Sequence, residues 1–330
     1  MINEKQHLSE KIFKKTIDMS PTRQGYGEGL VIAGENNERV VVLCADLTDS
    51  TKSNLFKEKF PKRFIEVGVA EQGIATIAGG MANYGKIPFI SSYAAFSPGR
   101  NWEQIRTTIA LNDVPVKIAG AHTGVSVGPD GATHQMLEDI ALMRAMPNMI
   151  VVATADAIES KKATIEAAKN DKPTYLRFTR EKTPVFTTDK TPFKIGKANI
   201  LWETKDPQVA IVACGPLVYE ALLAAKELSK RIGCVVINSH TIKPLDEQTI
   251  IRAARTCGAV VTVEEHQITG GLGSAVAECL SKNFPTPIEM IGMPDHFGES
   301  GTPDELLEKY GMKKDNIIEG IKKVIARKEK

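Results

Sequence analysis

EVGVAEQG, residues 66–73, decides how this chain folds, because it joins a strand to a helix and places one carboxylate, Glu71, at the junction. VVVLCAD (40–46) and RFIEVGVA (63–70) are apolar runs typical of buried strands, and GIATIAGGMANYG (73–85) has the spacing of a small-residue helix. An acidic residue in a first helical turn is ordinarily favoured by the helix dipole alone. A carboxylate largely cut off from water at such a junction could instead hold a proton on a ring nitrogen of a bound cofactor.

The neighbours of Glu71 favour the second interpretation. Val67, Val69, Ala70 and Ile74 flank it in the sequence, and we expect them to surround the carboxylate with apolar groups.

Length and composition exclude several classes of protein. The chain has 330 residues, which indicates two domains, and its 42 Lys and Arg against 40 Asp and Glu give a net charge of +2. That balance predicts neither nucleic acid nor a membrane surface as a partner. We expect no signal peptide and no membrane-spanning helix, because no long apolar run occurs. The five cysteines are widely spaced with no CxxC pair, which indicates buried free thiols in a cytoplasmic protein and no zinc site.

Apolar runs alternate with helix-like segments along the whole chain. The runs lack two-residue alternation, so we expect parallel strands buried on both faces, in two doubly wound α/β domains. The helical segments include 97–112, 134–148 and 156–171, with Ser97 and Asp156 as capping residues. A stretch rich in Pro, Thr and Lys separates the domains. We place the first domain at residues 1–187, a linker at 188–195 and a smaller second domain at 196–330.

The stretch GAHTGVSVGPDGATHQMLED (120–139) is the second candidate for chemistry. It places four glycines, His122, His134 and Asp130 between a strand and a helix. Ligands of open α/β sheets bind at the carboxyl ends of strands, so a polar, glycine-rich loop there is a candidate site. His134, which we expect at the start of the helix, could exchange a proton or bind a substrate hydroxyl. A capping or solvent-facing histidine is the simpler alternative.

Aromatic and basic residues stand at the ends of other segments. Tyr93 and Phe96 follow a strand, where Phe96 could stack on a planar ring, although both could equally be core aromatics. Three arginines lie at segment ends, where a guanidinium could make two parallel hydrogen bonds to a phosphate: Arg23, Arg177 and Arg180. Taken singly, each arginine is more simply explained as a surface charge.

GGLGSA (270–275) is rich in glycine, as nucleotide-binding loops are, but its glycines do not have the spacing of such a loop. It is not GxGxxG, and no acidic residue ends a strand about 20 residues further on. We therefore interpret it as a tight turn into a helix.

Together these stretches resemble the C-terminal two-thirds of transketolases, from about residue 15 to the end. The most specific parts are GVAEQ (68–72), GPDGATHQ (128–135), RAMPNM (144–149) and LRFTRE (176–181). The resemblance implies a pyrimidine-binding domain followed by a transketolase C-terminal domain, and thiamine diphosphate as cofactor. It further implies transfer of two-carbon ketol units between sugar phosphates, in the pentose phosphate pathway.

The same resemblance implies roles for individual residues. Glu71 would face N1′ of the cofactor's aminopyrimidine, Phe96 and Tyr93 would lie against that ring, and Asp46 would lie near the thiazolium. His134 would act with Glu71 in catalysis. The residues implied in substrate binding are Arg23, Ser50, His122, Asp130, His134 and Arg180.

Two departures from the family pattern bear on these expectations. SPGRNW (97–102) is about one residue longer than usual, with Gly and Arg where another aromatic is expected. The GDG motif, which with a later Asn normally holds the diphosphate and its metal, is absent from the chain. We therefore expect no metal site here and a separate N-terminal subunit that binds the diphosphate with Mg²⁺ or Ca²⁺. By analogy, the two subunits would form a heterotetramer.

Three alternatives remain open at this level. One is half of a 1-deoxyxylulose-5-phosphate synthase, against which His122 argues. Another is the β subunit of a 2-oxo acid dehydrogenase, which the paired basic anchors for a sugar phosphate disfavour. The third is a non-catalytic paralogue acting as a binding module, which the presence of Glu71, Asp130 and His134 together makes the weakest.

Overall fold

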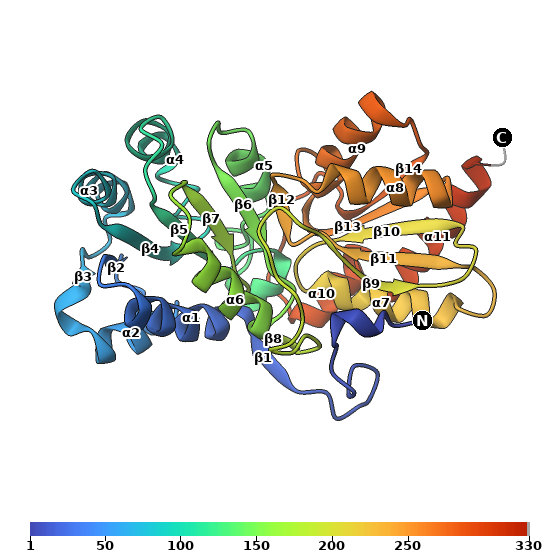
Figure 1. The fold of residues 1–330 in the computed structure, drawn as a ribbon, viewed down its shortest axis with the longest axis horizontal. Coiled ribbons are helices and arrows are strands. Elements are labelled where there is room, and N and C mark those ends of the chain that lie inside the picture. Colours follow the sequence, from blue (N-terminus) through green and yellow to red (C-terminus); the bar gives the residue numbers. More distant parts are fainter. Residues whose placement is uncertain (329–330) are drawn as a thin grey trace.

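Two sheets, one in each half of the chain, organise the molecule into two lobes that lie side by side (Figure 1). The computed structural model describes residues 1–328. The elements of the first half are η1 (Glu4–Gln6), β1 (Met19–Pro21), α1 (Thr22–Asn36), β2 (Val40–Cys44), α2 (Asn54–Lys59), η2 (Pro61–Arg63), β3 (Phe64–Glu66), α3 (Glu71–Asn83), β4 (Ile87–Tyr93), α4 (Trp102–Gln104), η3 (Ile105–Ala110), β5 (Lys117–Ala121), η4 (Val125–Asp130), α5 (Asp139–Arg144), β6 (Ile150–Ala153), α6 (Ala157–Ala167), β7 (Thr174–Arg177) and β8 (Lys182–Pro184).

The second half contributes the remaining strands and helices. They are β9 (Asn199–Glu203), β10 (Val209–Ala213), α7 (Leu217–Leu228), β11 (Cys234–Asn238), β12 (Thr241–Lys243), α8 (Glu247–Cys257), β13 (Val260–Gln267), α9 (Leu272–Asn283), β14 (Ile288–Met293), α10 (Pro303–Lys309) and α11 (Lys314–Lys328).

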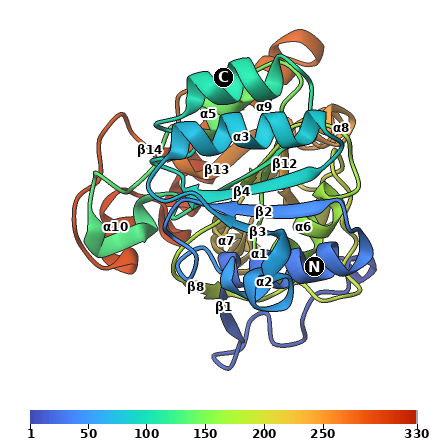
Figure 2. The ribbon, with the colours of Figure 1, turned by 90° about the vertical axis from the view of Figure 1, so that its left-hand side faces the viewer.

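The larger sheet has the strand order β12-β6-β7-β5-β4-β2-β3, and all its pairs except β12 with β6 are parallel. Helices cover both faces: α3 and α5 lie on one side, and α1, α2 and α6 on the other (Figure 2). All five residues of β2 are buried. A strand buried on both faces has no polar side, which explains its unbroken apolar sequence.

Helices α1 and α6 pack against each other because glycine lets their backbones meet. A Cβ on Gly25 would lie 1.8 Å from the carbonyl oxygen of Ala157, so no larger residue fits. Asp156 caps α6 as the sequence predicts, accepting a hydrogen bond from the amide of Glu159.

The smaller sheet has the order β14-β13-β10-β11-β9, with only the edge strand β9 antiparallel to its neighbour. Helices α8 and α9 cover one face, and α7 and α11 the other (Figure 1). The turn before α9 confirms our interpretation of GGLGSA. The amides of Leu272 and Gly273 donate to the buried carboxylate of Glu264 at 2.7 Å each, so a residue of the chain itself fills this helix N-terminus.

The two doubly wound α/β domains expected from the sequence are confirmed, with differences at particular elements. Ser97 does not cap a helix: α4 begins at Trp102, and its last turn passes into a π-helix over η3. The helix expected over 134–148 begins only at Asp139. Strand β12 lies in the second half of the chain but joins the sheet of the first half, so the halves are tied together. The domain limits at 187 and 196 stay predictions.

Other expectations concern thiols and membranes. All five cysteines are free and buried, as predicted. Within residues 1–328, the helices are too short or too polar to cross a bilayer.

Candidate active site

Glu71 is the first residue of α3, directly beyond β3, at the carboxyl edge of the larger sheet. The turn between them depends on Gly68, whose φ of +68° is a left-handed conformation that glycine adopts without strain. Glu66 fixes the same turn, because its carboxylate accepts hydrogen bonds from the amides of Asp46 at 2.8 Å and Gly68 at 3.1 Å. The junction predicted from EVGVAEQG therefore exists and is rigidly held.

The Glu71 carboxylate is 1% exposed and fully engaged by polar partners. Its Oε1 accepts a hydrogen bond from Ser92 Oγ at 3.1 Å, and its Oε2 accepts one from Arg100 Nη1 at 2.7 Å. Asn101 Nδ2 donates to its backbone carbonyl at 2.8 Å. The burial was predicted, but the apolar surround was wrong for Val69 and Ala70, which point to solvent.

Four rings form a contiguous cluster beside this carboxylate. Tyr93 stacks on His122 with ring centroids 3.7 Å apart and on Phe96 at 6.0 Å. His134 meets Phe96 edge-on at 5.5 Å. The cluster forms because Tyr93 ends β4 and His122 follows β5, two neighbouring parallel strands.

A basic group borders the rings. Arg23 donates to the carbonyl of Ser50 at 2.6 Å, and Arg180 donates to the carbonyl of Val127 at 2.9 Å and to Asp130 at 3.1 Å. Burial lowers the pKa of Arg23 from its usual value, and the nearby guanidinium of Arg180 acts in the same direction. Two guanidinium groups whose charges influence each other, one of them partly desolvated, favour an anionic ligand beside them.

His122 stays neutral at physiological pH. Burial above all, and then the charges of Arg23, Arg180 and His134, lower its pKa to about 3. Its Nδ1 is buried and has no hydrogen-bond partner within the described chain. A buried, unpartnered imidazole nitrogen beside two arginines is a site for a hydrogen bond from, or to, a ligand hydroxyl.

Hydrogen bonds from Gln135 hold the loop that carries Asp130 and His134. Gln135 Nε2 donates to the carbonyls of Val125 at 3.1 Å and Glu299 at 2.9 Å, which ties the loop to the second lobe. His134 was expected at the start of a helix. It lies instead in a turn five residues before α5, because this clamp holds the backbone in non-helical turns.

Two further candidates lie outside the cluster. Arg177 does not face a ligand: it is buried, and it pairs with Asp139 at 2.7 Å and donates to the carbonyl of Glu265 at 2.8 Å. Burial by itself would lower the pKa of Arg177, but the ion pair with Asp139 and further nearby charges outweigh burial and hold that pKa above its usual value. Arg177 also joins the two lobes. Asp46 is exposed at the end of β2, and none of the hydrogen bonds or ion pairs within residues 1–328 connects its side chain to the rings.

Sequence reasoning missed three residues that hold Glu71. Ser92, Arg100 and Asn101 all contact it. The unusual SPGRNW stretch was the only signal for Arg100 and Asn101, and nothing in the sequence pointed to Ser92. Within residues 1–328, no group of three or more His, Cys, Asp or Glu side chains is placed to hold a metal ion.

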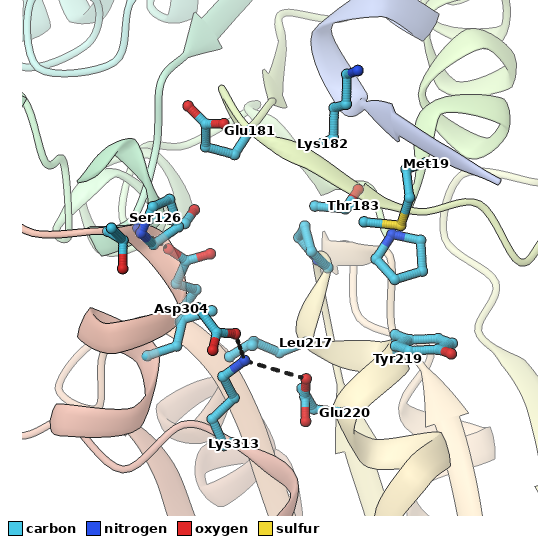
Figure 3. A pocket seen from close by; sticks show the side chains of 16 residues that line it. Met19, Ser126, Glu181, Lys182, Thr183, Leu217, Tyr219, Glu220, Asp304 and Lys313 are labelled. Carbon is cyan, nitrogen blue, oxygen red and sulfur yellow. Dashed lines mark hydrogen bonds and ion pairs between the residues drawn. The ribbon is translucent and has the colours of Figure 1, made fainter. Parts of the chain in front are cut away.

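A separate cavity of about 480 Å³ lies between the lobes, lined by Ser126 and Glu181 of the first lobe and by Asp304 of the second (Figure 3). Its wall is mostly apolar, with Leu217 and Tyr219 of α7 on one side. Lys313 reaches Asp304 and Glu220 across it. The ring cluster and Glu71 do not line this cavity, so it is distinct from the candidate active site.

Comparison with known families assigns both halves of the chain. The family described as "Transketolase, pyrimidine binding domain" matches residues 18–185, and "Transketolase, C-terminal domain" matches residues 196–317.

Individual relatives agree with that assignment. A protein of Methanocaldococcus jannaschii named as a transketolase C-terminal section is 43% identical over 91% of this chain and 94% of its own length. The 6-deoxy-6-sulfo-D-fructose transketolase subunit SqwH of Clostridium sp. strain MSTE9 is 39% identical over 93% and 95%. A solved structure described as "Split gene transketolase, inactive beta4 tetramer" is 42% identical, with a TM-score of 0.87 over 93% of this chain and 99% of that one.

Proposed function

The chain belongs to the transketolase family as a transketolase-type subunit, and on that premise we propose that it transfers two-carbon ketol units between sugar phosphates once a second subunit completes its site. The cofactor would be thiamine diphosphate, shared between the two chains. These sugars are those of the pentose phosphate pathway, in which we place the enzyme, in the cytoplasm.

One observation carries the proposal: a buried carboxylate, an aromatic platform and a pair of arginines lie together at one edge of the sheet. Glu71 and Phe96 fit the aminopyrimidine end of the cofactor, because a buried carboxylate lies near a ring face: Arg100, which donates to Glu71, has its Cζ 4.7 Å from the centre of the Phe96 ring. When bound, thiamine diphosphate supplies a carbon that accepts the electrons released as the ketose bond breaks. Glu71 would hold or release a proton at N1′ of the pyrimidine. Tyr93 would hold Phe96 in place, because the two rings stack with their centroids 6.0 Å apart.

The substrate would lie across the basic group. Arg23 and Arg180 would anchor the sugar's terminal phosphate, with the Ser50 segment beside them. His122, neutral and unpartnered at Nδ1, would bind a sugar hydroxyl. Asp130 and His134 would contact hydroxyls near the reacting carbon, and His134 would also exchange protons there.

The dependence on a second subunit is part of the proposal. The relative SqwH is named as a subunit, and the solved relative is described as an inactive tetramer of one kind of chain. Both support a division of labour in which the other polypeptide binds the diphosphate with Mg²⁺ or Ca²⁺. Asp46, exposed at the sheet edge, would approach the cofactor only in that assembly.

A surface of α3 supports association with further chains. Val69, Ile77 and Tyr84 are 71%, 44% and 92% exposed, and Gly73 and Gly80 lie on the same side of the helix. An apolar stripe flattened by glycines next to a candidate active site is typical of a subunit contact. We propose that another subunit covers this face in the complete enzyme, which we expect to be a heterotetramer.

The test is to mix the chain with the diphosphate-binding subunit from the same source and supply xylulose 5-phosphate and ribose 5-phosphate. We expect ketol transfer from the mixture and none from either chain alone. Consumption of pyruvate instead would favour a 1-deoxyxylulose-5-phosphate synthase or a 2-oxo acid dehydrogenase. No activity in any combination would favour a binding module.

One second substrate deserves its own assay, because SqwH is named for a sulfosugar. A sulfonate, like a phosphate, presents oxygen acceptors to two guanidinium groups, so the anchor of Arg23 and Arg180 fits both. 6-Deoxy-6-sulfofructose as donor would distinguish the two specificities.

A further inference from the structure

We propose that Arg100 occupies the place of the cofactor's aminopyrimidine in this chain and must leave it before the cofactor can bind. The inference rests on the function proposed above for Glu71 and Phe96, and it adds a competitor for that site.

The geometry of Arg100 carries the proposal. Its Nη1 donates to Glu71 Oε2 at 2.7 Å, and its Cζ lies 4.7 Å from the centre of the Phe96 ring. A guanidinium is planar, stacks on aromatic faces and donates N–H bonds in its own plane. The aminopyrimidine would make the same two contacts, a hydrogen bond to Glu71 and a ring face against Phe96, so the two groups compete for one place.

Burial explains why a stand-in is favourable when no cofactor is present. Glu71 is 1% exposed, and a buried carboxylate without a partner is strongly destabilising. Arg100 supplies both a counter-charge and a hydrogen bond, in addition to the weaker one from Ser92.

Release of Arg100 requires only a side-chain movement. The Arg100 side chain is 45% exposed, so solvent is directly accessible to it. The backbone beside it is fixed, because Asn101 is fully buried and its Nδ2 donates to the Glu71 carbonyl at 2.8 Å and to Ser97 Oγ at 3.2 Å. The guanidinium can therefore turn outward while Glu71 and Phe96 keep their positions.

The first experiment measures the pair in the chain by itself, through urea unfolding. Arg100→Met keeps the length of the side chain without its charge, and we expect it to destabilise the wild-type chain clearly but the Glu71→Gln chain little. Arg106→Met, an exposed arginine on the following turn, is the matched control and should change neither. Equal effects of Arg100→Met in both backgrounds would contradict the pairing.

The second experiment measures thiamine diphosphate affinity by calorimetry, with the chain mixed with its diphosphate-binding subunit. If Arg100 blocks the site for most of the time, the apparent affinity for the cofactor falls in proportion to the fraction of molecules in which the site is open. We expect Arg100→Met to bind about tenfold more tightly than wild type, Arg100→Lys to lie between them, and Arg106→Met to match wild type.

The outcomes separate this inference from the proposed function. If wild type binds the cofactor and Arg100→Met binds it equally or more weakly, Arg100 is not a competitor, although the proposed function stands. If the wild-type mixture binds no thiamine diphosphate, the proposed function fails and this inference fails with it. Arg100→Lys keeps the positive charge beside Glu71, so it tests the competition even if Arg100→Met folds poorly.

Discussion

At the scale of single residues, the candidate site depends on contacts between side chains that lie far apart in the sequence. Glu71 was placed correctly at a buried junction because a strand-to-helix switch has a clear apolar pattern. Its partners Ser92 and Arg100 come from β4 and the segment after it, and no periodicity reveals which side chain turns toward a carboxylate 20 to 30 residues away. The failure with Arg177 has the same origin, because its partner Asp139 is near only in space.

Arg180 offers a prediction at this scale. Arg180→Ala should raise KM for the sugar phosphate about 10- to 100-fold in the mixed subunits, because a charge-assisted hydrogen bond is lost, and leave kcat nearly unchanged. Lys182→Ala, an exposed cation two residues away, is the control and should behave as wild type. Steady-state kinetics with varied donor sugar check this. Equal KM values for Arg180→Ala and wild type would remove Arg180 from the anchor.

At the scale of elements, the long buried strands were predictable and the short or interrupted elements were not. β2 and β10 are unbroken apolar runs, which single sequences reveal well. β12 has only three residues, and it joins the other lobe's sheet through pairing that no local pattern encodes. The shortened helix at α5 reflects the Gln135 clamp, a tertiary contact that overrides helical spacing.

Helix α6 provides a prediction about pH. Burial, and then the charge of Asp156, raise the pKa of Glu159 to about 8, well above its ordinary 4.5. Glu159 contacts Asn238 Nδ2 at 2.7 Å, so it links α6 to β11. The folded chain keeps the proton that the unfolded chain has released, so the stability from this group falls as pH rises from about 4.5 to 8.

The measurement is the free energy of unfolding in urea between pH 6.5 and 8, a range above the ordinary pKa of the buried histidines. Glu159 alone should lower the stability by at most about 1.4 kcal/mol per pH unit across this range, while buried Lys117, whose pKa is lowered to about 7, acts in the opposite direction in every variant. Relative to wild type, Glu159→Gln should therefore make the slope of stability against pH more positive, whereas Glu166→Gln, on the outer side of the same helix, should not. Identical slopes in wild type and Glu159→Gln would show that Glu159 is ionised when folded.

At the scale of the whole molecule, the two lobes are joined by polar contacts as well as by strand β12. Arg177, Gln135 and Glu159 each bond across the boundary, so the loop of Asp130 and His134 is held by both lobes. The division into two α/β units was predictable from the alternation of segments. How the lobes dock was not, because each contact pairs residues far apart in the sequence.

The exposed face of α3 leads to a prediction about assembly. Ile77→Asp places a charge in the middle of the apolar stripe, which should weaken association because the contact would have to bury it. Sedimentation velocity of the isolated chain should show smaller species than wild type at the same concentration. Lys322→Asp, on the exposed side of α11, is the control. An unchanged distribution for Ile77→Asp would show that this face is not the contact.

The most direct test of the account is the turnover of Glu71→Gln in the mixed subunits at saturating thiamine diphosphate. The substitution keeps the shape of the side chain and removes its ability to exchange a proton with N1′, so we expect ketol transfer to fall at least about 100-fold while the subunits still assemble. Ordinary turnover by an assembled Glu71→Gln enzyme would contradict the central claim, that this buried carboxylate serves the cofactor.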